Sequence, residues 1–544
     1  MGAKPALPGV SHLAWPASLL VLAALVTVAC AAGWAAEETP HGQGLILPEF
    51  KVPYCEIRMP RSLAPLPAHF DWREQGKVSP VKDQGKCGAC YAFASIGNIE
   101  SKMLREGAGS FDFSENNIKE CSPYGAKCRG GNYWIVANYL SRGGAVLEAC
   151  DPYVEAVAGC KTDCPSVKTL LDWRAISEDS LPPTNVLKAY LMTYGPLFIG
   201  INAGHGDAWY SEFLNYDGSY TLHYTDHVGY RDLNHAVLLV GWDDNLIHSG
   251  GQGGWIVKNS YGALWGGPCG YGDEGGYFTI AYGSAGIGRT SSFIYESQDF
   301  DPDGRLFFYD EAGYFKGFGY HSTEGWAMCK FVPAEDVVLQ RVEFWSVDAI
   351  PDADVYIYDD IDGMTPTNLI ASQLDYAVEL RGYHSISLDS RPVVHAGDDV
   401  YVAVKITAAS DTVPIPVDAL GPKVQHVCYT SPDGITWYEF TAGDLAIRLR
   451  ATLDNDGTPP EISISAKQDP IATSELEVSV DISEAIIDAS LLLTIGADTL
   501  EMQRIATPGY KYRGTYEIKG SGVAEIAASA RDLVDNLGVN AILS

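Results

Sequence analysis

The sequence has few basic side chains for its acidic content. Its 544 residues include 37 lysines and arginines against 69 aspartates and glutamates, which gives a formal net charge of −32. Phosphate backbones and anionic lipid surfaces repel such a chain, so nucleic acid and anionic membranes are excluded as partners. The same charge keeps a protein soluble, and we expect a monomer.

Paired metal-binding cysteines are also missing. The chain has 12 cysteines, but no Cys-x2-Cys pair is followed by a second one at the spacing of a zinc site. Nearly all the cysteines fall where loops are expected, which favours disulfide bonds in an oxidising compartment. From this cysteine pattern we expect neither a metal ion nor another cofactor.

Residues 5–36 contain no acidic residue, lysine or arginine. Lys4 precedes an almost unbroken apolar run at 19–32, and small residues at 31–36 offer a cleavage site. We interpret 1–36 as a signal peptide. The alternatives are an uncleaved anchor over 17–36 and lipidation at Cys30, whose flanking residues fit a lipobox poorly. All three predict that the rest of the chain is secreted or anchored at the cell surface.

One stretch, DQGKCGACYAFA at residues 83–94, carries the chemistry. Apolar side chains recur at helical spacing after Cys90, so this cysteine is expected at a helix N-terminus, where the dipole and free N–H groups favour a thiolate. Two later apolar runs, 233–241 and 255–262, carry His235 and Asn259. A cysteine, a histidine and an asparagine at the edges of buried elements form a nucleophile, a base and an orienting group.

These residues resemble the papain family of cysteine proteases. CGACY at 87–91 fits the signature around the catalytic cysteine of papain and the cathepsins, and the likeness extends from about residue 67 to 293. PAHFDWR at 67–73 is similar to the family's mature start, CRGG at 128–131 to its substrate wall, and NSYGALWG at 259–266 to its asparagine motif. His235 follows Cys90 at the family's spacing, whereas Asn259 lies beyond it. We attribute the excess to a loop insertion at 249–254.

The resemblance implies peptide hydrolysis through a Cys90–His235–Asn259 triad and an acyl-enzyme. It implies that Gln84 donates a side-chain N–H to an oxyanion hole, together with the Cys90 backbone. Trp265 is expected to shield the His–Asn hydrogen bond from water.

The resemblance also implies how substrate binds. Gly130 and Gly131 would let an extended peptide lie against the backbone. The main specificity pocket, for the residue two positions before the scissile bond, would be roomy and apolar, with these lining residues: Tyr133, Gly200 and Leu233, with Ser291 as its floor.

The disulfide pattern follows in part from the same resemblance. It pairs Cys87 with Cys128 and Cys121 with Cys160 and leaves Cys90 free, while Cys150 and Cys164 flank the same loop and would close it. Cys329 and Cys428 remain for one bridge in the domain that follows. By elimination, Cys55 pairs with Cys269 and tethers the N-terminal segment. The alternative is that Cys55 leaves with a propeptide and Cys269 stays a thiol.

The element pattern predicts a papain-like, two-lobed α+β catalytic domain followed by two all-β sandwich domains. Helical periods precede strands within 67–298. Residues 37–66 form a short extension or propeptide, without the charged helical signature of plant and animal relatives. Alternating strands over 299–453 are similar to a lectin-like domain of some bacterial and archaeal secreted proteins. Residues 454–544 start with a linker and resemble an Ig-like module.

We therefore predict a secreted cysteine endopeptidase that acts on proteins or peptides. Residues 299–544 are expected to fold apart from the protease, to be dispensable for cleaving small peptides, and to localise the enzyme at a cell-surface or glycan ligand. One competing class is a catalytically inactive papain-fold adhesin. Another is transglutaminase-like acyl transfer, which would require an aspartate in place of Asn259.

Two weaker patterns leave alternatives open. Asp-x-Asp-Gly occurs at 301–304, 360–363 and 454–457, and we interpret these runs as turns, with calcium binding as the alternative. Trp326, Trp345 and Trp437 are expected in the core, with a sugar-binding platform as the alternative.

Overall fold

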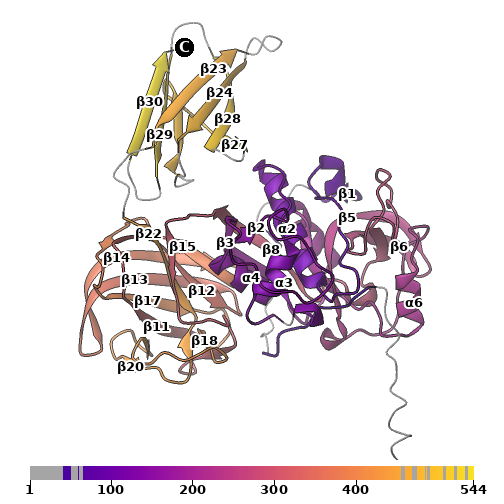
Figure 1. The fold of residues 1–544 in the computed structure, drawn as a ribbon, viewed down its shortest axis with the longest axis horizontal. Helices are drawn as coiled ribbons and strands as arrows, with labels where there is room; N and C mark the ends of the chain where they lie inside the picture. The colour runs from indigo at the N-terminus through magenta and orange to yellow at the C-terminus, as the bar shows by residue number, and fades with distance from the viewer. Residues whose placement is uncertain are drawn as a thin grey trace, which may run out of the picture. The chain divides into compact units, whose positions relative to one another are not determined.

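A computed structural model describes residues 41–50, 59–60, 65–125, 127–454, 460–468, 475–483, 486, 490–506, 510–519, 524–532 and 537–543 (Figure 1). The interpretations of residues 1–36, of Cys55 and of the linker after residue 454 concern parts of the chain outside these ranges. Within the described ranges, no helix is both long and apolar enough to cross a membrane.

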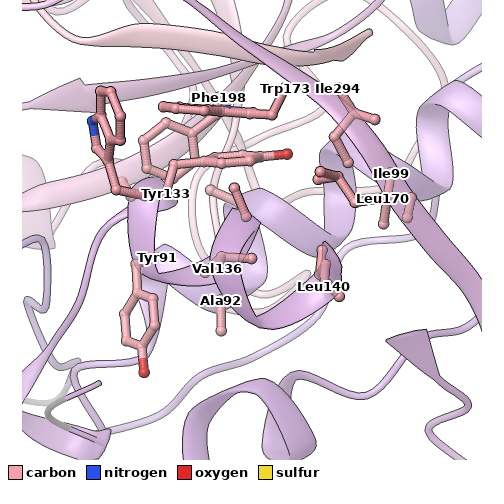
Figure 2. Packing of buried hydrophobic residues seen from close by; sticks show 14 of the residues in the cluster. Tyr91, Ala92, Ile99, Tyr133, Val136, Leu140, Leu170, Trp173, Phe198 and Ile294 are labelled. Atoms are coloured by element: carbon pink, nitrogen blue, oxygen red, sulfur yellow. The ribbon is translucent and has the colours of Figure 1, made fainter. Parts of the chain in front are cut away.

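The first lobe is built around a helix that is buried along most of its length. α2 (Cys90–Glu106) is buried without interruption from Cys90 to Met103, and Gly107, in the left-handed conformation, ends it. Gly97 brings α2 close to the neighbouring sheet, because a Cβ at this position would lie 3.2 Å from Leu238 Cδ2. In Figure 2 the α2 side chains meet those of α4 and an aromatic group that includes Tyr133, Trp173 and Phe198. Further α-helices in the described part of the chain are α3 (Glu115–Cys121), α4 (Tyr133–Arg142), α5 (Thr184–Tyr194) and α6 (Ala208–Leu214).

The second lobe is an antiparallel sheet whose strands follow the order β7-β6-β5-β4-β8-β3. These strands are β3 (Ser166–Ser177), β4 (Leu197–Ile201), β5 (His235–His248), β6 (Gly251–Lys258), β7 (Tyr277–Ala281) and β8 (Ser291–Asp299); the short β1 (His69–Asp71) and β2 (Ala145–Val146) pair with β5 and β3. The expected loop insertion at 249–254 is wrong. β5 and β6 continue to pair up to His248 and Gly251, so the extra residues lengthen a hairpin.

The sheet does not end with the first domain. β3 pairs with β15 (Arg381–Ser387), with Trp173 opposite Tyr383, and the order continues through β12 (Val337–Ser346), β22 (Ile447–Leu453) and β9 (Gly304–Phe307). In the described part of the chain this makes one sheet of 13 strands. The expectation that residues 299–453 fold apart from the protease is therefore wrong, because a backbone ladder joins the two domains.

Buried side chains reinforce this junction. Trp345 is 1% exposed and stacks on Trp134, with ring centroids 5.5 Å apart. Arg448, fully buried, pairs with Asp310 at 2.7 Å and donates to the Asn138 side chain in α4 at 2.6 Å. The alternative of a sugar platform at Trp345 is wrong, since its ring is covered by the first domain.

The middle domain is a β-sandwich. A six-stranded sheet, counted over the described residues, runs β14-β13-β17-β11-β19-β20 and faces the strands of the shared sheet across an apolar core. Its strands are β11 (Glu324–Phe331), β13 (Ile350–Asp362), β14 (Thr365–Val378), β17 (Val400–Thr407), β19 (Cys428–Ser431) and β20 (Tyr438–Glu439); a small sheet contains β10 (Lys316–Phe318), β18 (Ile415–Asp418) and β21 (Asp444–Leu445), and β16 (Val393–Val394) pairs with β12. Trp437 is buried in this domain, whereas Trp326 is only half-buried.

The C-terminal domain has two antiparallel sheets with the strand orders β23-β24-β28-β27 and β26-β25-β29-β30, which enclose a small apolar core. The strands are β23 (Ile462–Gln468), β24 (Glu475–Ile482), β25 (Leu492–Ile495), β26 (Asp498–Leu500), β27 (Gln503–Ala506), β28 (Tyr510–Glu517), β29 (Glu525–Arg531) and β30 (Leu537–Leu543). This arrangement agrees with an Ig-like sandwich.

The acidic run at 301–304 forms a turn that leads into β9, whereas 360–362 is the end of β13 and Gly363 lies in the turn that follows. Asp301 accepts a hydrogen bond from the Asp303 backbone, and Gly363 takes a left-handed conformation between β13 and β14. Within the described residues, carboxylates close enough to share an ion gather instead at Asp352, Asp354 and Asp375. The Lys405 ammonium already lies 3.1 Å from Asp352 and 3.4 Å from Asp354, so two of these three carboxylates are paired with a cation.

The junction gives a first testable prediction. Trp345→Ala should lower the free energy of unfolding by about 3–5 kcal/mol, because it leaves a cavity against Trp134 and Trp173. The same change at Tyr438, which is 52% exposed in the same domain, should have little effect. Chemical denaturation of both variants measures this. A chain ending at residue 298 that resists denaturant as well as the full-length protein would contradict it.

Candidate active site

Cys90, His235 and Asn259 come together from three elements. Cys90 is the first residue of α2, His235 the first of β5, and Asn259 follows the last residue of β6. His235 Nε2 lies 2.8 Å from Asn259 Oδ1, and the backbone N–H of Ala236 points at Cys90 Sγ from 3.4 Å. Because the Asn259 oxygen can only accept, Nε2 carries the proton. Nδ1 is left as the basic nitrogen and has no partner of its own.

Gln84 lies beside this group with a fixed amide orientation. Its Nε2 donates to the carbonyls of Gly42 and Cys87 at 2.7 and 2.8 Å. Its Oε1 accepts a hydrogen bond from Ser260 Oγ at 2.5 Å, so the nitrogen must face the cleft. Sequence reasoning missed Ser260, although it directly follows Asn259 within the recognised motif.

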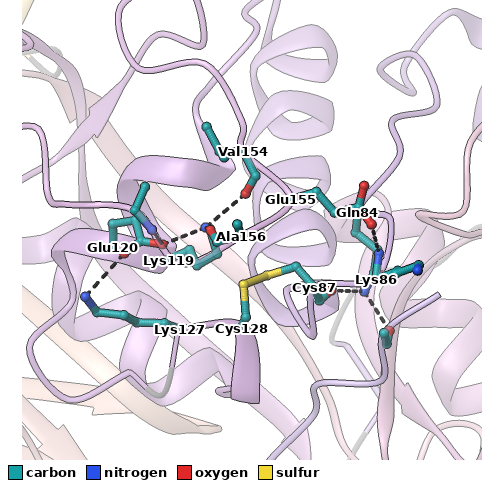
Figure 3. The surroundings of a disulfide bond; sticks show 12 residues. Gln84, Lys86, Cys87, Lys119, Glu120, Lys127, Cys128, Val154, Glu155 and Ala156 are labelled. Atoms are coloured by element: carbon teal, nitrogen blue, oxygen red, sulfur yellow. Dashed lines mark hydrogen bonds and ion pairs between the residues drawn. A yellow bond between two sulfur atoms is a disulfide. The ribbon is translucent and has the colours of Figure 1, made fainter. Parts of the chain in front are cut away.

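Disulfides hold the loops that carry Gln84 and the glycine-rich wall. In the described part of the chain the bonded pairs are Cys87–Cys128, Cys121–Cys160 and Cys150–Cys164. Figure 3 shows Gln84 and Lys86 on one side of the Cys87–Cys128 bond, with the buried Lys119–Glu120 pair on the other. The nucleophile's loop is thereby fixed to the loop that leads into Gly130.

The remaining cysteines among the described residues are unbonded in this structure. Cys329 and Cys428 are opposite residues on β11 and β19 with their sulfur atoms 3.7 Å apart, and no bond joins them in this structure. Cys269 is a half-buried thiol, and its predicted partner Cys55 lies outside the described residues. Both pairings stay predictions.

A segment that sequence reasoning left without a structure lies across the site. We call residues 41–48 the cleft segment. The Gly42 carbonyl takes the Gln84 N–H, and Leu45 N–H donates to the Asn234 carbonyl at 3.0 Å. Gly42 and Gly44 are required here, because a Cβ on Gly44 would lie 1.8 Å from the Gly88 carbonyl oxygen. The Gly-Gln-Gly sequence at 42–44 was the available signal for this close approach.

The glycine-rich wall pairs with the cleft segment as a short strand. Gly131 N–H donates to the Gly44 carbonyl, and the Gly131 carbonyl accepts from Ile46 N–H, each at 2.9 Å; the bridge between Leu45 and Gly131 is parallel. Gly130 adopts a φ of 130°, and a Cβ on it would lie 2.5 Å from the Gly44 oxygen. The wall therefore accepts an extended backbone only because it has no side chains.

The side chain of Leu45 lies at the predicted specificity pocket. A Cβ on Gly200 would meet Leu45 Cδ2 at 2.7 Å, Thr290 Cγ2 at 2.4 Å and Leu233 Cδ1 at 3.5 Å. Leu45 and Leu233 belong to one apolar cluster with Tyr133, whose hydroxyl donates to Asn98. Ser291 is buried on β8 opposite Ile199, and its hydroxyl has no partner. Thr290, which sequence reasoning missed, contacts the pocket more directly than Ser291.

Burial favours the neutral forms of Cys90 and His235. Burial raises the pKa of the Cys90 thiol to about 11 and lowers the pKa of His235 to about 4. Burial thus favours the neutral thiol over the expected thiolate, although backbone N–H groups, including that of Gly44 in the cleft segment, act in the opposite direction. The helix terminus alone does not outweigh that burial.

Aromatic rings cover the histidine. Tyr261 lies against His235, with ring centroids 4.9 Å apart, and His41 of the cleft segment stacks on the same tyrosine at 4.2 Å. Trp265 packs 5.4 Å from Tyr261, and its indole N–H donates to the Leu214 carbonyl. Tyr261 is thus the ring in contact with His235, and Trp265 supports it.

Two regions of the chain match known protein families. Residues 66–295 match the papain family of cysteine proteases, and residues 306–445 match the lectin-like domain family. A viral cathepsin of Heliothis zea nuclear polyhedrosis virus is 34% identical over 218 residues, which are 39% of this chain and 54% of the relative. A cysteine proteinase of Trypanosoma brucei brucei is 35% identical over 222 residues, 40% of this chain and 44% of the relative. The chain spans about half the length of these relatives.

A solved structure shares the two-domain fold. The cysteine protease and lectin-like domains of Cwp84, a surface layer associated protein of Clostridium difficile, superpose with a TM-score of 0.60 at 19% identity. The match covers 80% of this chain and 96% of that one.

Proposed function

Residues 66–295 are a papain-family cysteine protease domain, and from this we propose that the chain is a cysteine endopeptidase made in a latent form. The observation that carries the proposal is the His235–Asn259 hydrogen bond beside Cys90 at the start of α2. The alternative of transglutaminase-like transfer is disfavoured because Asn259, and not an aspartate, orients the histidine. The alternative of an inactive adhesin is disfavoured because Gln84 and the triad residues are all present.

In the open enzyme, His235 Nδ1 takes the Cys90 proton and the thiolate attacks the carbonyl carbon of the scissile peptide bond. His235 then returns the proton to the leaving amine as the C–N bond breaks. Water, deprotonated by the same nitrogen, hydrolyses the thioester and regenerates the thiol. Asn259 needs only to orient the ring, since the Cys90–His235 pair supplies the charges itself.

Gln84 is assigned to the oxyanion. Its Nε2 now holds the Gly42 carbonyl oxygen, a neutral acceptor at the position where the negative oxygen of a tetrahedral intermediate would lie. The second donor would be the backbone N–H of Cys90.

The cleft segment blocks the site without serving as a substrate. A substrate reaches Cys90 from the specificity pocket by running toward its C-terminus. From Leu45 in the pocket, the chain passes the site toward Gly42 and thus runs toward its N-terminus. This reversed direction presents no peptide bond in the productive orientation, so the segment inhibits and is not cut at Cys90. The absence of a helical propeptide pattern therefore does not argue against latency.

We assign the enzyme to the cell exterior, on the basis of its disulfides and the apolar N-terminal stretch. The substrates are proteins or peptides. The lectin-like domain is assigned a glycan or cell-surface ligand, and Cwp84, of similar fold, is described as surface layer associated.

Labelling tests the proposal directly. A site for a specific protease, inserted within 51–64, allows the folded full-length chain to be cut and the cleft segment to be removed. An epoxide inhibitor of thiol proteases should then modify Cys90 alone and stop hydrolysis of a short fluorogenic peptide. Absence of both labelling and hydrolysis after cutting would overturn the proposal.

Ser260 gives a second prediction, as a positioning residue. Ser260→Ala should lower kcat about tenfold with little change in KM, because the Gln84 amide loses the partner that orients it. Gln84→Ala should lower kcat by about a hundredfold or more. Steady-state kinetics of both variants and of the double variant measure this. Additive losses in the double variant would contradict the assignment, since Ser260 acts only through Gln84.

The pocket gives a third prediction. Peptides with leucine or phenylalanine two positions before the scissile bond should be preferred over those with arginine or glutamate. Gly200→Ala should lower kcat/KM for the leucine peptide about tenfold and much less for an alanine peptide, because the added methyl fills the space that Leu45 now contacts. A peptide-library profile dominated by charged residues at this position would refute the pocket assignment.

A further inference from the structure

Beyond the specificity pocket, the N-terminal segment reaches a second apolar site that belongs to both domains. Phe50 packs edge-on against Trp134 of α4, at 5.1 Å between centroids, and against Tyr314 of the lectin-like domain, at 5.0 Å. Trp134 and Tyr314 are 5% and 9% exposed, so the site is an aromatic recess built into the junction.

A cavity adjoins the recess on the side of the lectin-like domain. A cavity of about 310 Å³ lies beside Phe50. It is lined by Phe50 itself and by these residues of the lectin-like domain: Tyr314, Phe315, Lys316, Gly317, Val347, Asp411 and Val413. Most of the lining is apolar side chain and backbone, which favours an aromatic or large aliphatic group.

Polar side chains connect this recess to the catalytic cleft. Asn132 Nδ2 donates to the Ile46 carbonyl at 2.8 Å, and an Arg231 guanidinium N–H donates to the Pro48 carbonyl at 2.8 Å. Both donors bind backbone carbonyl groups and not side chains. Any extended peptide that continues out of the specificity pocket can therefore accept the same hydrogen bonds.

We propose that the recess between Trp134 and Tyr314 is a remote substrate subsite, which accepts an aromatic side chain of a peptide upstream of its scissile bond. The inference rests on the proposed protease function. Phe50 stands in for the substrate side chain in the latent form and leaves with the cleft segment. Phe50 lies five positions after Leu45, a span of at most about 18 Å. A substrate runs in the opposite direction, so its aromatic residue lies about five positions before the one in the specificity pocket.

The lectin-like domain then contributes directly to substrate choice. Tyr314 and Val347 come from that domain, whereas the nucleophile and base come from the protease. A short peptide never reaches the recess, so its hydrolysis reports only on the catalytic cleft. A long peptide with an aromatic residue at the right distance gains the two ring contacts that Phe50 makes now.

The test uses the full-length chain carrying Leu45→Asp and a specific cleavage site within 51–64, cut after folding. Fluorogenic peptides share leucine two positions before the scissile bond and carry one phenylalanine, moved from three to seven positions before that leucine, with alanine elsewhere. We expect kcat/KM to peak near five positions, about tenfold above the all-alanine peptide and mainly through KM.

Tyr314→Ala should flatten this profile, whereas Tyr438→Ala, an exposed tyrosine elsewhere in the same domain, should keep it. If Tyr314→Ala does not fold, Val413→Asp at the 37% exposed rim of the cavity replaces it. A flat profile in the parent, or an unchanged peak in the variant, overturns the subsite. Failure to hydrolyse the short leucine peptide would refute the protease function itself, so the two outcomes are distinguishable.

Discussion

Cys90→Ala is expected to lower kcat/KM for a short peptide by about 10⁴-fold or more, with little change in thermal stability. No other side chain in the described cleft can form the thioester, and what remains is the catalysis that the oxyanion site and binding provide alone. His235→Ala should cause a loss of the same order. Asn259→Ala should retain measurable activity, because it removes only the group that orients the ring.

Cys269→Ala is the matched control. Cys269 is the other free thiol of the described protease domain, it lies in the loop after the asparagine motif, and its loss should leave turnover unchanged. Kinetics are measured after the cleft segment has been removed, so that inhibition does not mask the difference. Wild-type turnover in Cys90→Ala would reject the protease assignment and favour the papain-fold adhesin.

Leu45→Asp is expected to release the latent enzyme without any cleavage. Leu45 is 6% exposed against Gly200 and Leu233, and a carboxylate cannot be buried there unpaired. The rate of Cys90 alkylation at pH 7 should rise roughly a hundredfold if the closed form now accounts for about 99% of molecules. Ile46→Asp, a neighbouring position that is 45% exposed, should leave the rate unchanged.

The closed form should also depend on pH. Burial holds the pKa of His235 at about 4, below its ordinary value of 6.5. Protons therefore bind the open form preferentially, because water reaches His235 there, and closure weakens as the pH falls toward the pKa of the closed form. His41 acts in the same direction, because it adds repulsion when it is charged. The alkylation rate of the wild type, divided by that of Leu45→Asp, should rise through this range. A ratio that stays constant from pH 7 to pH 4 would contradict the linkage.

The sequence was sufficient to predict which residues form the candidate active site. Cys90, His235 and Asn259 each stand at the edge of an apolar run, and a side chain at the edge of a buried element is held in one place by the packing behind it. The helix after Cys90 was predicted to within a residue of its end, because Ala92, Ile96, Ile99 and Met103 repeat at the helical period. Two of the bonded cysteine pairs agree with those that the family resemblance implied, and Cys150–Cys164 agrees with the pair expected to close one loop.

Tertiary structure decided how these parts act together. The cleft segment has no periodic pattern, and its inhibition depends on Gly42 and Gly44 meeting a wall more than forty residues away in the chain. The pairing of β3 with β15 also could not be predicted from the local sequence. The pattern of a strand shows which of its faces is buried, but not which strand lies beside it. The sequence by itself therefore indicated the candidate nucleophile, its base and the domain types. Only the packing of distant segments showed that residues 41–48 lie across the candidate site and that the lectin-like domain shares a sheet with the protease domain.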